Sequence, residues 1–542
     1  MSTTAAELSV DIVIVGAGPT GLTAAHLCHR LGLSAVVLEQ RDGPQRCPAA
    51  HAINARTFEI WRQAGVAMGP VLDAALPPEE AGLVHWVTKF GGDVIGTLPY
   101  ERQGDEMLAI TPTPLRNLSQ HRVEPLLLSP GLDVRYGHEW LSASETPGGV
   151  DVAASGPDGP LRITANYLLG ADGAASSVRR SLGVELMGPR SLQSFVMVHM
   201  AADFRPLMGG RPGVLYFILD PASGGTFISH GCDREWVYMH PWDPETQPVE
   251  TLTVERCSAL ARAAMADPDA PFEVLNIGTW HMSAQVAERY GVGRTFLVGD
   301  AAHRFPPTGG LGLNTGAADV HNLIWKLAAV HAGWLDPALL DTYEAERRPV
   351  AQFNCDQSMA NAFKLIEVPM ALGLTDDVEE SAAAMHAILA DPGGRAEVEA
   401  AIANQAIHFD LLGLQLGHSY GGPLVLADGT DAVAPDEPAR DYLPSTRPGG
   451  RLPHAWLPDG RSTLDLVDVQ VPTILLAAGV EVPDSSGGPP FVVGVVPDGV
   501  WAEGLGLSPG QCLIVRPDQH IGYRGPLRGA ADAMGRLFGA AG

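Results

Sequence analysis

Three acidic side chains in this sequence stand where a short apolar segment ends. Asp172 precedes Gly173, and Asp300 follows Gly299. Glu39 closes a third apolar run. A carboxylate at the end of a buried strand can accept hydrogen bonds from the hydroxyl groups of a ribose-like chain. We therefore predict that three strand ends meet at one elongated ligand.

The segment around Asp300 joins a strand to a long helix. The apolar run 295–298 predicts the strand, and an amphipathic helix begins at about residue 315, after a loop with Pro306, Pro307, Gly309, Gly310 and Gly312. Such a loop brings unpaired N–H groups and the positive end of a helix dipole to one point, which favours an electron-rich ligand atom. A glycine-rich structural turn is the alternative.

The N-terminal segment favours a ligand-binding loop over a structural turn. The apolar, β-branched run 10–15 predicts a strand buried on both faces, and the letters GAGPTG follow at once. Gly16, Gly18 and Gly21 provide the tight turn, the close approach to a pyrophosphate and the strand–helix packing of a dinucleotide-binding unit. A predicted helix and a second strand follow, so Glu39 falls where such a unit binds a ribose hydroxyl. We predict a dinucleotide site.

Further polar candidates lie in the loop after Glu39 and in the segment TPTPLRNLSQHRVEPLLL. Arg46 and His51 are close in sequence to the predicted nucleotide site. The second segment is predicted as a helix with Arg116 and Gln120 on one face, within reach of phosphates. A solvated charge for Arg46, a packed ring for His51 and a solvent-facing pair for the other two are the alternatives.

Composition limits the partners of this chain. It has 542 residues, which predict about three domains, and a formal net charge of -27. An acidic field of this size disfavours nucleic acid and anionic membranes. Six cysteines are scattered without a CxxC pair or metal-ligand spacing, so we predict no disulfide framework and no metal site. No basic region precedes the first apolar run and no window is apolar enough to span a membrane, so we expect a cytoplasmic protein.

The pattern changes twice after the N-terminal region. Residues 186–282 alternate in polarity and are rich in aromatic residues, which predicts an antiparallel sheet that forms a substrate wall. Residues 473–477, 491–496 and 512–515 predict short strands, and 527–538 predict a final helix, so the chain should end in a small α/β domain. Polar candidates on the antiparallel sheet, each open to a structural role, are His199, Tyr216, His230, Tyr238 and His281.

Taken together, GAGPTG, GADG and GDAAHRFPPTGGLGLNTG resemble the motifs of the class A FAD-dependent aromatic hydroxylases, the superfamily of p-hydroxybenzoate hydroxylase and phenol hydroxylase. With AHAINARTFEIW, the resemblance narrows to the 2,4-dichlorophenol 6-monooxygenase type and to actinobacterial polyketide hydroxylases. It implies an α/β fold with a Rossmann-like FAD-binding domain in two parts (1–185, and 283–400 with the long helices). An antiparallel-sheet substrate domain (186–282) and a C-terminal thioredoxin-like domain (401–542) complete the implied fold.

The resemblance implies FAD as the cofactor. Asp300 would bind its ribityl chain, and the backbone of 310–314 would lie at the pyrimidine edge of the flavin ring. The implied cofactor-binding residues are Gly16, Gly18, Pro19, Thr20, Gly21, Glu39, Gln40, Arg46, Arg116, Gln120, Asp172, Gly173, Gly299, Asp300, Pro307, Gly310, Gly312, Leu313 and Asn314.

His51 is the catalytic candidate, and it departs from the family pattern. Fungal phenol hydroxylase has an aspartate as its presumed base five residues before the arginine that matches Arg56, whereas this chain has an imidazole there. A neutral imidazole, with an ordinary pKa of about 6.5, can still take a phenolic proton. The substrate candidates are Tyr216, His230 and Pro306. The final domain also departs from a redox thioredoxin because it has no CxxC, so packing or dimer contacts are its expected role.

The implied reaction is aromatic hydroxylation. NADPH or NADH would reduce the flavin transiently, since no second GxGxxG stands in a strand–helix context, and O2 would add to the reduced flavin at C4a before oxygen passes to a phenolic ring. The partners are then a small aromatic molecule and O2, with a homodimer left open. Baeyer–Villiger or epoxidation chemistry on a polyketide and a non-catalytic flavin-binding protein stay as alternatives. A flavin-dependent halogenase is disfavoured because its WxWxIP motif is absent.

Overall fold

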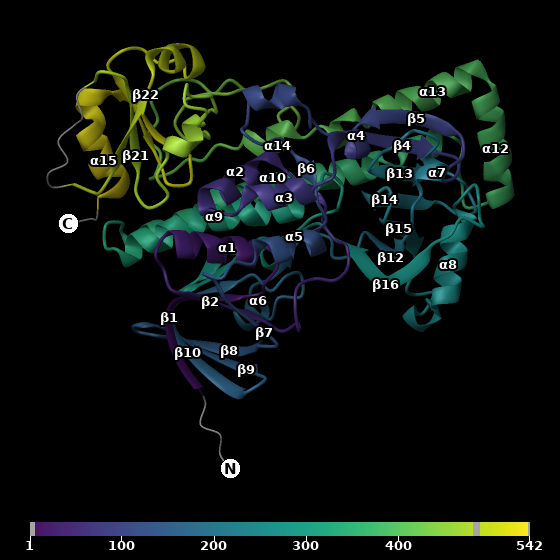
Figure 1. The fold of residues 1–542 in the computed structure, drawn as a ribbon, viewed down its shortest axis with the longest axis horizontal. Helices are drawn as coiled ribbons and strands as arrows, with labels where there is room; N and C mark the ends of the chain where they lie inside the picture. The colour runs from purple at the N-terminus through teal and green to yellow at the C-terminus, as the bar shows by residue number, and fades with distance from the viewer. Residues whose placement is uncertain (1–5, 481–487, 540–542) are drawn as a thin grey trace.

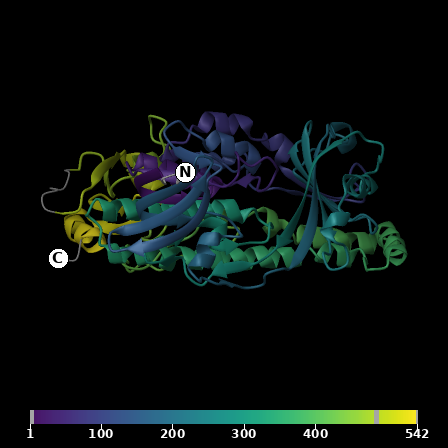
Figure 2. The ribbon, with the colours of Figure 1, turned by 90° about the horizontal axis from the view of Figure 1, so that it is seen from below.

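The computed structural model describes residues 6–480 and 488–539. Two long helices, α9 (Leu311–His331) and α10 (Thr342–Lys364), run through the centre of the molecule. Figure 1 shows a largely parallel sheet below them, a second sheet at one end and the C-terminal unit at the other. The view from below in Figure 2 shows the same elongated arrangement.

The N-terminal sheet has the strand order β18-β19-β10-β1-β2-β7, and β9 and β8 extend it beside the first part of β10. β1 pairs in parallel with β2 and β10, and β10 pairs in parallel with β19. The register places Val15 beside Leu38 and Gly170, and Gly170 beside Leu297. The carboxyl ends of these strands therefore share one edge. The strands are β1 (Ala6–Val15), β2 (Ala35–Glu39), β7 (Asp133–Tyr136), β8 (Glu139–Thr146), β9 (Gly149–Gly156), β10 (Gly159–Gly170), β18 (Gly291–Val292) and β19 (Thr295–Leu297).

Helices cover this sheet and carry the loops of its carboxyl edge. α1 (Pro19–Arg30) begins directly after the glycine motif and packs against α9, α2 (Ala55–Ala64) and α5 (Gln120–Leu127). Short pairings link the loops, namely β3 (Ala52–Ile53) with β6 (Arg116–Asn117), and β17 (Gln285–Ala287) with β11 (Leu186–Met187) and β20 (His303–Arg304). The remaining short helices here are α3 (Met68–Ala74), α4 (Pro78–Ala81) and α6 (Ser177–Ser181).

The second sheet has the order β16-β12-β15-β14-β13-β4-β5 and is antiparallel except where β13 runs parallel to β4. β4 (Leu83–Val87) and β5 (Val94–Pro99) join it from outside the range 186–282 in which the sheet was expected. Its other strands are β12 (Gln193–Ala201), β13 (Leu215–Ile218), β14 (Gly225–Gly231), β15 (Glu235–Trp242) and β16 (Glu273–Met282). The helices around it are α7 (Arg205–Met208), α8 (Val254–Ala263), α11 (Glu367–Ala371), α12 (Val378–Ala390) and α13 (Pro392–Ala403).

The C-terminal unit follows the short α14 (Leu412–Leu416) and has the strand order β22-β21-β23-β24. β21 (Thr473–Ala477), β22 (Val492–Val496), β23 (Gln511–Val515) and α15 (Ala530–Phe538) lie close to the predicted elements, whereas β24 (Ile521–Pro526) was not predicted. Trp325 and Ala329 of α9 pack into the same core as Ile474 and Phe538. The long helix thus joins the core of this unit to the N-terminal sheet.

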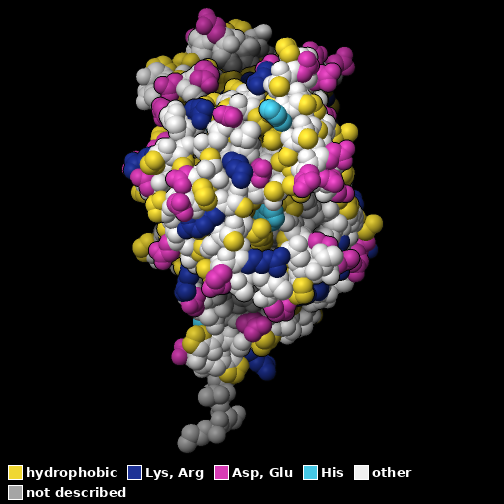
Figure 3. Space-filling view, turned by 90° about the vertical axis from the view of Figure 1, so that its right-hand side faces the viewer, with side chains coloured by type: hydrophobic (Ala, Val, Ile, Leu, Met, Phe, Trp, Pro, Cys, Tyr) yellow, Lys and Arg dark blue, Asp and Glu magenta, His cyan; other side chains and the backbone are white. Residues whose placement is uncertain are grey.

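The surface at the end of the molecule near the second sheet mixes the two signs of charge. Figure 3 shows acidic and basic side chains interspersed over this face. Within residues 6–480 and 488–539, no helix has the length and apolar character that crossing a membrane requires.

Candidate active site

A cavity of about 1790 Å³ is lined both by the loops at the carboxyl edge of the N-terminal sheet and by the second sheet. A pocket for one drug-sized ligand has roughly 300–1,000 Å³. The cavity can therefore hold a cofactor and a substrate together. The predicted site residues that line it are Gly18, Pro19, Thr20, His51, Gln120, Gly173, Asp300, Pro306, Pro307, Gly310, Gly312 and Leu313.

The glycine motif after β1 forms an open cradle. A Cβ atom on Gly16 would collide with the carbonyl of Ala171, and one on Gly21 would collide with the carbonyl of Gly16. By contrast, no atom lies within 4 Å of the Cβ position on Gly18, which faces the cavity. Gly18 is also the N-cap of α1, and no side chain caps that helix. The free N–H groups and open space suit the pyrophosphate of a dinucleotide such as FAD.

The loop before α9 provides a second helix N-terminus on the same cavity. Gly310 caps α9 with a φ of 62° in the left-handed region, and no side chain accepts from the first N–H groups of the helix. Asp300 projects into the cavity. Burial raises the pKa of this carboxyl, while His303 and Arg304 partly oppose that effect. The Asp300 side chain is exposed to the cavity, so a hydroxyl-rich ligand chain could donate hydrogen bonds to its carboxylate.

Glu39 and Asp172 hold backbone rather than line the cavity. Glu39 Oε2 accepts from the Ala17 N–H at 2.9 Å, inside the glycine turn. Asp172 Oδ2 accepts from the N–H groups of Ser177 and Val178 at 2.7 and 3.0 Å, at the start of α6. Both carboxylates therefore fix the strand ends that the prediction brought together, and the second oxygen of Asp172 has no protein partner.

The structure places several predicted cofactor residues away from the cavity. Arg46 is largely exposed and pairs with Asp42, and Gln40 lies on the outer surface beside Arg41. Both belong to the turn that leaves β2, so their side chains follow the solvent side of the loop.

The helix predicted over Arg116 is wrong in its first part. Arg116 lies in β6, which pairs with β3, and its guanidinium donates to the carbonyls of Gln103 and Leu115 at 2.8 Å each. Only from Gln120 onward is the segment helical. Strand pairing with 52–53 overrides the local helical pattern.

Asn314 ties elements together through its side chain. Its Oδ1 accepts from the Asn54 N–H and the Thr57 hydroxyl at 2.9 and 2.7 Å, and its Nδ2 donates to the Ala52 carbonyl at 2.9 Å. These bonds hold the segment beside His51 against the first turn of α9. The side chain is thus used within the protein and does not line the cavity.

Tyr216 points away from the cavity, which corrects its prediction as a substrate residue. Its ring packs on Phe90 and Trp236 in the core behind the sheet, and its hydroxyl donates to the Arg211 carbonyl at 2.8 Å. Side chains alternate along a strand, so the neighbours Leu215 and Phe217 line the cavity instead.

His51 stands where the loop after β2 meets the second sheet. Its Nδ1 lies 3.0 Å from Asn117 Oδ1, and its ring meets the His230 ring edge to face at 5.6 Å. Burial lowers the pKa of His51, and the hydrogen bond that His51 Nδ1–H donates to Asn117 partly opposes this effect. Burial also lowers the pKa of His230 well below its ordinary value. Both rings are therefore neutral near pH 7.

A carboxylate beside His230 joins His199, which the sequence offered as a candidate, to His121, which it did not. Glu235 Oε1 accepts from His199 Nε2 at 2.8 Å and from His121 Nε2 at 3.0 Å. Burial opposes ionisation of Glu235, but these two bonds outweigh it and lower its pKa. His199 lines the cavity on β12, whereas His121 belongs to α5. The cluster fixes the second sheet against the dinucleotide-binding unit.

The part of the cavity wall that the second sheet provides is largely aromatic and apolar. Trp86 stacks on Phe217 at 5.3 Å, and Phe195 stacks on Trp280 at 5.9 Å between ring centroids. Alternation alone could have placed Phe195, Met197 and His199 on one face of β12, but not which face meets the cavity. Trp86 comes from β4, outside the expected sheet, and had no sequence signal.

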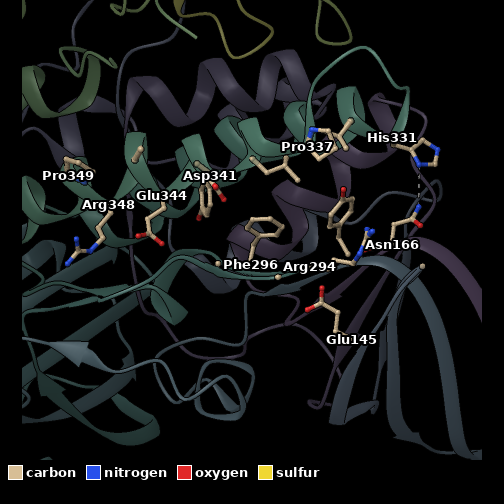
Figure 4. A pocket seen from close by; sticks show the side chains of 18 residues that line it. Glu145, Asn166, Arg294, Phe296, His331, Pro337, Asp341, Glu344, Arg348 and Pro349 are labelled. Atoms are coloured by element: carbon tan, nitrogen blue, oxygen red, sulfur yellow. Dashed lines mark hydrogen bonds between the residues drawn. The ribbon is translucent and has the colours of Figure 1, made fainter. Parts of the chain in front are cut away.

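A second depression, of about 820 Å³, lies at the amino end of β19 (Figure 4). It is lined by polar side chains such as Arg294, Glu145 and Glu344, and Asn166 Nδ2 lies 3.4 Å from His331 Nδ1. Active sites of such sheets lie at the carboxyl ends of the strands. The chemistry therefore belongs to the larger cavity.

An open glycine cradle, two free helix N-termini and an apolar chamber share one cavity, which defines an enzyme that places a dinucleotide cofactor beside its substrate. Comparisons with known proteins agree. Residues 9–358 match the family model of an FAD binding domain, and residues 445–541 match that of the C-terminal region of aromatic-ring hydroxylases. The chain is 30% identical to 2,4-dichlorophenol 6-monooxygenase of Cupriavidus pinatubonensis, across 99% of this chain and 96% of that one. It is 32% identical to aklavinone 12-hydroxylase RdmE of Streptomyces purpurascens, across 98% of each chain.

Among solved structures, the flavin-dependent monooxygenase PieE in complex with FAD and substrate superposes with a TM-score of 0.91 at 32% identity, covering 98% of this chain and 99% of that one. This chain belongs to the FAD-dependent aromatic-ring hydroxylases. The predicted family, the FAD cofactor and the monooxygenase class are confirmed.

Proposed function

We propose that this enzyme hydroxylates a multi-ring phenolic compound, with NADPH or NADH as transient reductant and O2 as the source of the inserted oxygen. One observation carries the proposal: the glycine cradle and the Asp300 loop share a cavity of about 1790 Å³ with an aromatic wall. The names of the two relatives contain a dichlorophenol and aklavinone, which agrees with a hydroxylated aromatic substrate.

The shape of the wall supports a flat substrate with more than one ring. Phe217, which stacks on the buried Trp86, and the stacked pair Phe195–Trp280 line the cavity from different strands of the second sheet. Met197 and Met239 add flexible, polarisable surface to the same chamber. Aromatic faces bind aromatic rings by offset or edge contacts. A single small ring would leave much of this wall uncovered.

Residues of the cofactor side would hold FAD in an extended form. Gly18 and the N-terminus of α1 would take the pyrophosphate, Asp300 the hydroxyls of the ribityl chain, and the N–H groups that open α9 an electron-rich edge of the ring. When bound, FAD supplies the redox chemistry that links the nicotinamide to O2.

His51 would act as the base for the phenolic proton. Asn117 Nδ2 donates to Gln103 Oε1 at 3.4 Å, so its Oδ1 is the atom that accepts from His51 Nδ1–H. This tautomer leaves the lone pair on His51 Nε2. Since burial keeps the imidazole neutral, Nε2 can accept the proton of a substrate hydroxyl and increase the electron density of the ring.

Four arginines support a docking place for the nicotinamide donor. Arg179, Arg180, Arg190 and Arg304 line the cavity beside Gly173. In the part of the chain that the structure describes, none of them forms an ion pair with a carboxylate. Guanidinium groups bind phosphates in a bidentate manner. We propose that they hold the donor's pyrophosphate while its nicotinamide reaches the flavin.

We also propose that the C-terminal unit has a thioredoxin-like arrangement within residues 401–542. The expected limits of the other domains are proposed with one change, since residues 83–99 belong to the second sheet. β21 pairs in parallel with β22 and antiparallel with β23, which β24 follows. Its buried Cys512 has no CxxC partner in sequence, so the proposed role is structural.

The test is NADPH and NADH oxidation by the FAD-saturated protein, with and without a panel of one-ring and multi-ring phenols. We expect multi-ring phenols to stimulate oxidation and to yield a product one oxygen atom heavier, labelled when 18O2 is used. Stimulation by one-ring phenols alone would contradict the substrate class. An oxygen inserted into a carbon–carbon bond would identify Baeyer–Villiger chemistry, and bound flavin without any stimulation would favour a non-catalytic protein.

A further inference from the structure

One arginine of the C-terminal unit forms an ion pair with the central helix α10. Arg516, at the end of β23, is fully buried, and its guanidinium donates to both oxygens of Glu346 on α10 at 2.5 and 2.8 Å. Asp518 also accepts from Arg516, at 2.6 Å and 3.1 Å. Such a bidentate, desolvated pair fixes the position of Glu346 strongly.

Glu346 is bound from the α9 side as well. Lys326 Nζ and Asn322 Nδ2 donate to its Oε2 at 2.8 and 2.7 Å. Burial lowers the pKa of Lys326 to about 8, against the attraction of Glu346. The positive charges of Lys326 and Arg516 balance the negative charges of the two carboxylates, Glu346 and Asp518. Removing one of these four groups therefore leaves a buried charge uncompensated.

The next residue on α10, Arg347, extends the hydrogen-bond network toward the loop that carries Asp300. Arg347 Nε donates to Asp319 Oδ1 on α9 at 2.9 Å, and its Nη1 donates to the Tyr420 hydroxyl at 3.0 Å. Glu346 and Arg347 are adjacent on α10. By holding Glu346, Arg516 therefore also helps to position the backbone from which the Arg347 side chain projects.

Asp319 accepts hydrogen bonds from the loop that carries Asp300, from one residue before Asp300 and one after it. Its Oδ2 accepts from the Gly299 N–H at 3.1 Å and from His303 Nε2 at 2.7 Å. Asp319 has no exposed surface, and Asp300 stands between the two bound residues in sequence. One carboxylate oxygen therefore holds the chain on both sides of Asp300.

We propose that Asp319 is a positioning residue for the cofactor loop and that Arg516, through Glu346 and Arg347, makes the C-terminal unit part of the FAD site. This inference rests on the proposed role of Asp300. Stability alone is a weak reason for such a network, because a buried ion pair often gains little over apolar packing. A network that fixes one loop conformation gives the chain a preformed cofactor site.

The experiment measures FAD affinity of the apoprotein by flavin fluorescence, beside its thermal midpoint without FAD. Asp319→Asn and the milder Glu346→Gln should each weaken FAD binding about tenfold or more, since each removes charge-assisted bonds. Amide exchange of residues 299–304 should also accelerate in both apoproteins. Asp300→Asn serves as the positive control for loss of a direct contact.

Arg524→Gln is the matched control. Arg524 Nε donates to Asp428 at 2.6 Å within the C-terminal unit, without contact to Glu346. It should lower the thermal midpoint and leave FAD affinity unchanged. The inference is wrong if Asp319→Asn and Glu346→Gln bind FAD like the parent protein, or if FAD affinity in all three variants merely follows the thermal midpoint. Failure of the parent protein to bind FAD, or to hydroxylate any phenol while binding it, would instead contradict the family role or the proposed function.

Discussion

The two sides of the cavity are built from different parts of the chain. The cofactor side consists largely of backbone, namely glycine turns, strand ends and two helix N-termini, while the carboxylates Glu39 and Asp172 hold that backbone in place. The substrate side consists of side chains that project from the second sheet. Backbone geometry tolerates few substitutions, whereas projecting side chains can change without moving the sheet. Such an enzyme can keep one cofactor while its substrate varies.

The largest effect should come from the backbone of the cradle. Gly16 has a φ of +107°, and a Cβ there would collide with the Ala171 carbonyl, so Gly16→Ala should yield protein without bound flavin. The flavin-to-protein absorbance ratio measures this. Gly32→Ala is the control, because Gly32 also has a positive φ (+74°) but has open space around it, which leaves only a strain of about 1–2 kcal/mol. Full flavin content in Gly16→Ala would contradict the conclusion that backbone geometry forms the cofactor side of the cavity.

On the substrate side, His51→Ala should slow hydroxylation on the order of 10²-fold by removing the proposed base. Flavin reduction by the nicotinamide donor should change little, because the cofactor side is untouched. Stopped-flow absorbance separates the two steps. His281→Ala is a matched control, since His281 lines the cavity but its Nδ1 is hydrogen-bonded to Ser194 Oγ at 2.8 Å on the neighbouring strand β12. Equal hydroxylation rates in His51→Ala and the parent would remove His51 from the mechanism.

The buried state of His51 also predicts a dependence on pH. Its pKa lies below the ordinary 6.5 because burial disfavours the charged ring, so hydroxylation should hold level above pH 6.5 and fall only when the pH drops through the lowered pKa. The same shift works against folding in acid, because the unfolded ring binds a proton that the folded ring resists. Stability should decrease below pH 6.5, and urea unfolding of the parent and of His51→Gln measures the difference. An acid limb of the rate that His51→Gln retains would assign it to another group.

The smallest effect should come from the aromatic wall. Phe217→Leu removes one face of the stacked pair with Trp86 and should raise KM for a multi-ring phenol several-fold, with FAD affinity unchanged. Since aromatic pairs contribute about 0.5–1.5 kcal/mol beyond burial, the loss stays within about tenfold. Steady-state kinetics with one-ring and multi-ring phenols measures it. A loss of flavin in this variant would show that the two sides are not separable.

Sequence motifs revealed the cofactor side because its function depends on residue type at fixed spacing. Gly16, Gly18 and Gly21 can be recognised because glycine, without a Cβ, allows turns and close contacts that other residues do not. Asp300 can be recognised because it directly follows an apolar strand. Arg46 and Arg116 were less predictable, because a loop charge can turn to solvent or to a carbonyl with little change in energy. Nothing local distinguishes these outcomes.

The substrate side depended on contacts between distant segments. Alternation predicted the strands of the second sheet, but Tyr216 could not be assigned to a face without the neighbouring core that contains Phe90. β4 and β5 enter from far upstream, and the pairing of Glu235 with His121 joins two domains. Asp319 lies within a helix whose apolar pattern gives no sign that one carboxylate binds three partners.

The four arginines beside Gly173 have a consequence for the rate of encounter with the reductant. The protein carries a formal charge of -27, so an anionic dinucleotide meets net repulsion at long range, while the four arginines would attract it close to the cavity. Dissolved ions weaken electrostatic forces beyond about 8 Å at physiological ionic strength, and thus reduce the distant repulsion more than the attraction at contact. Moderate salt should therefore speed association, and only higher salt should slow it. The enzyme would capture its electron donor fastest in the ionic conditions of a cell rather than in dilute buffer.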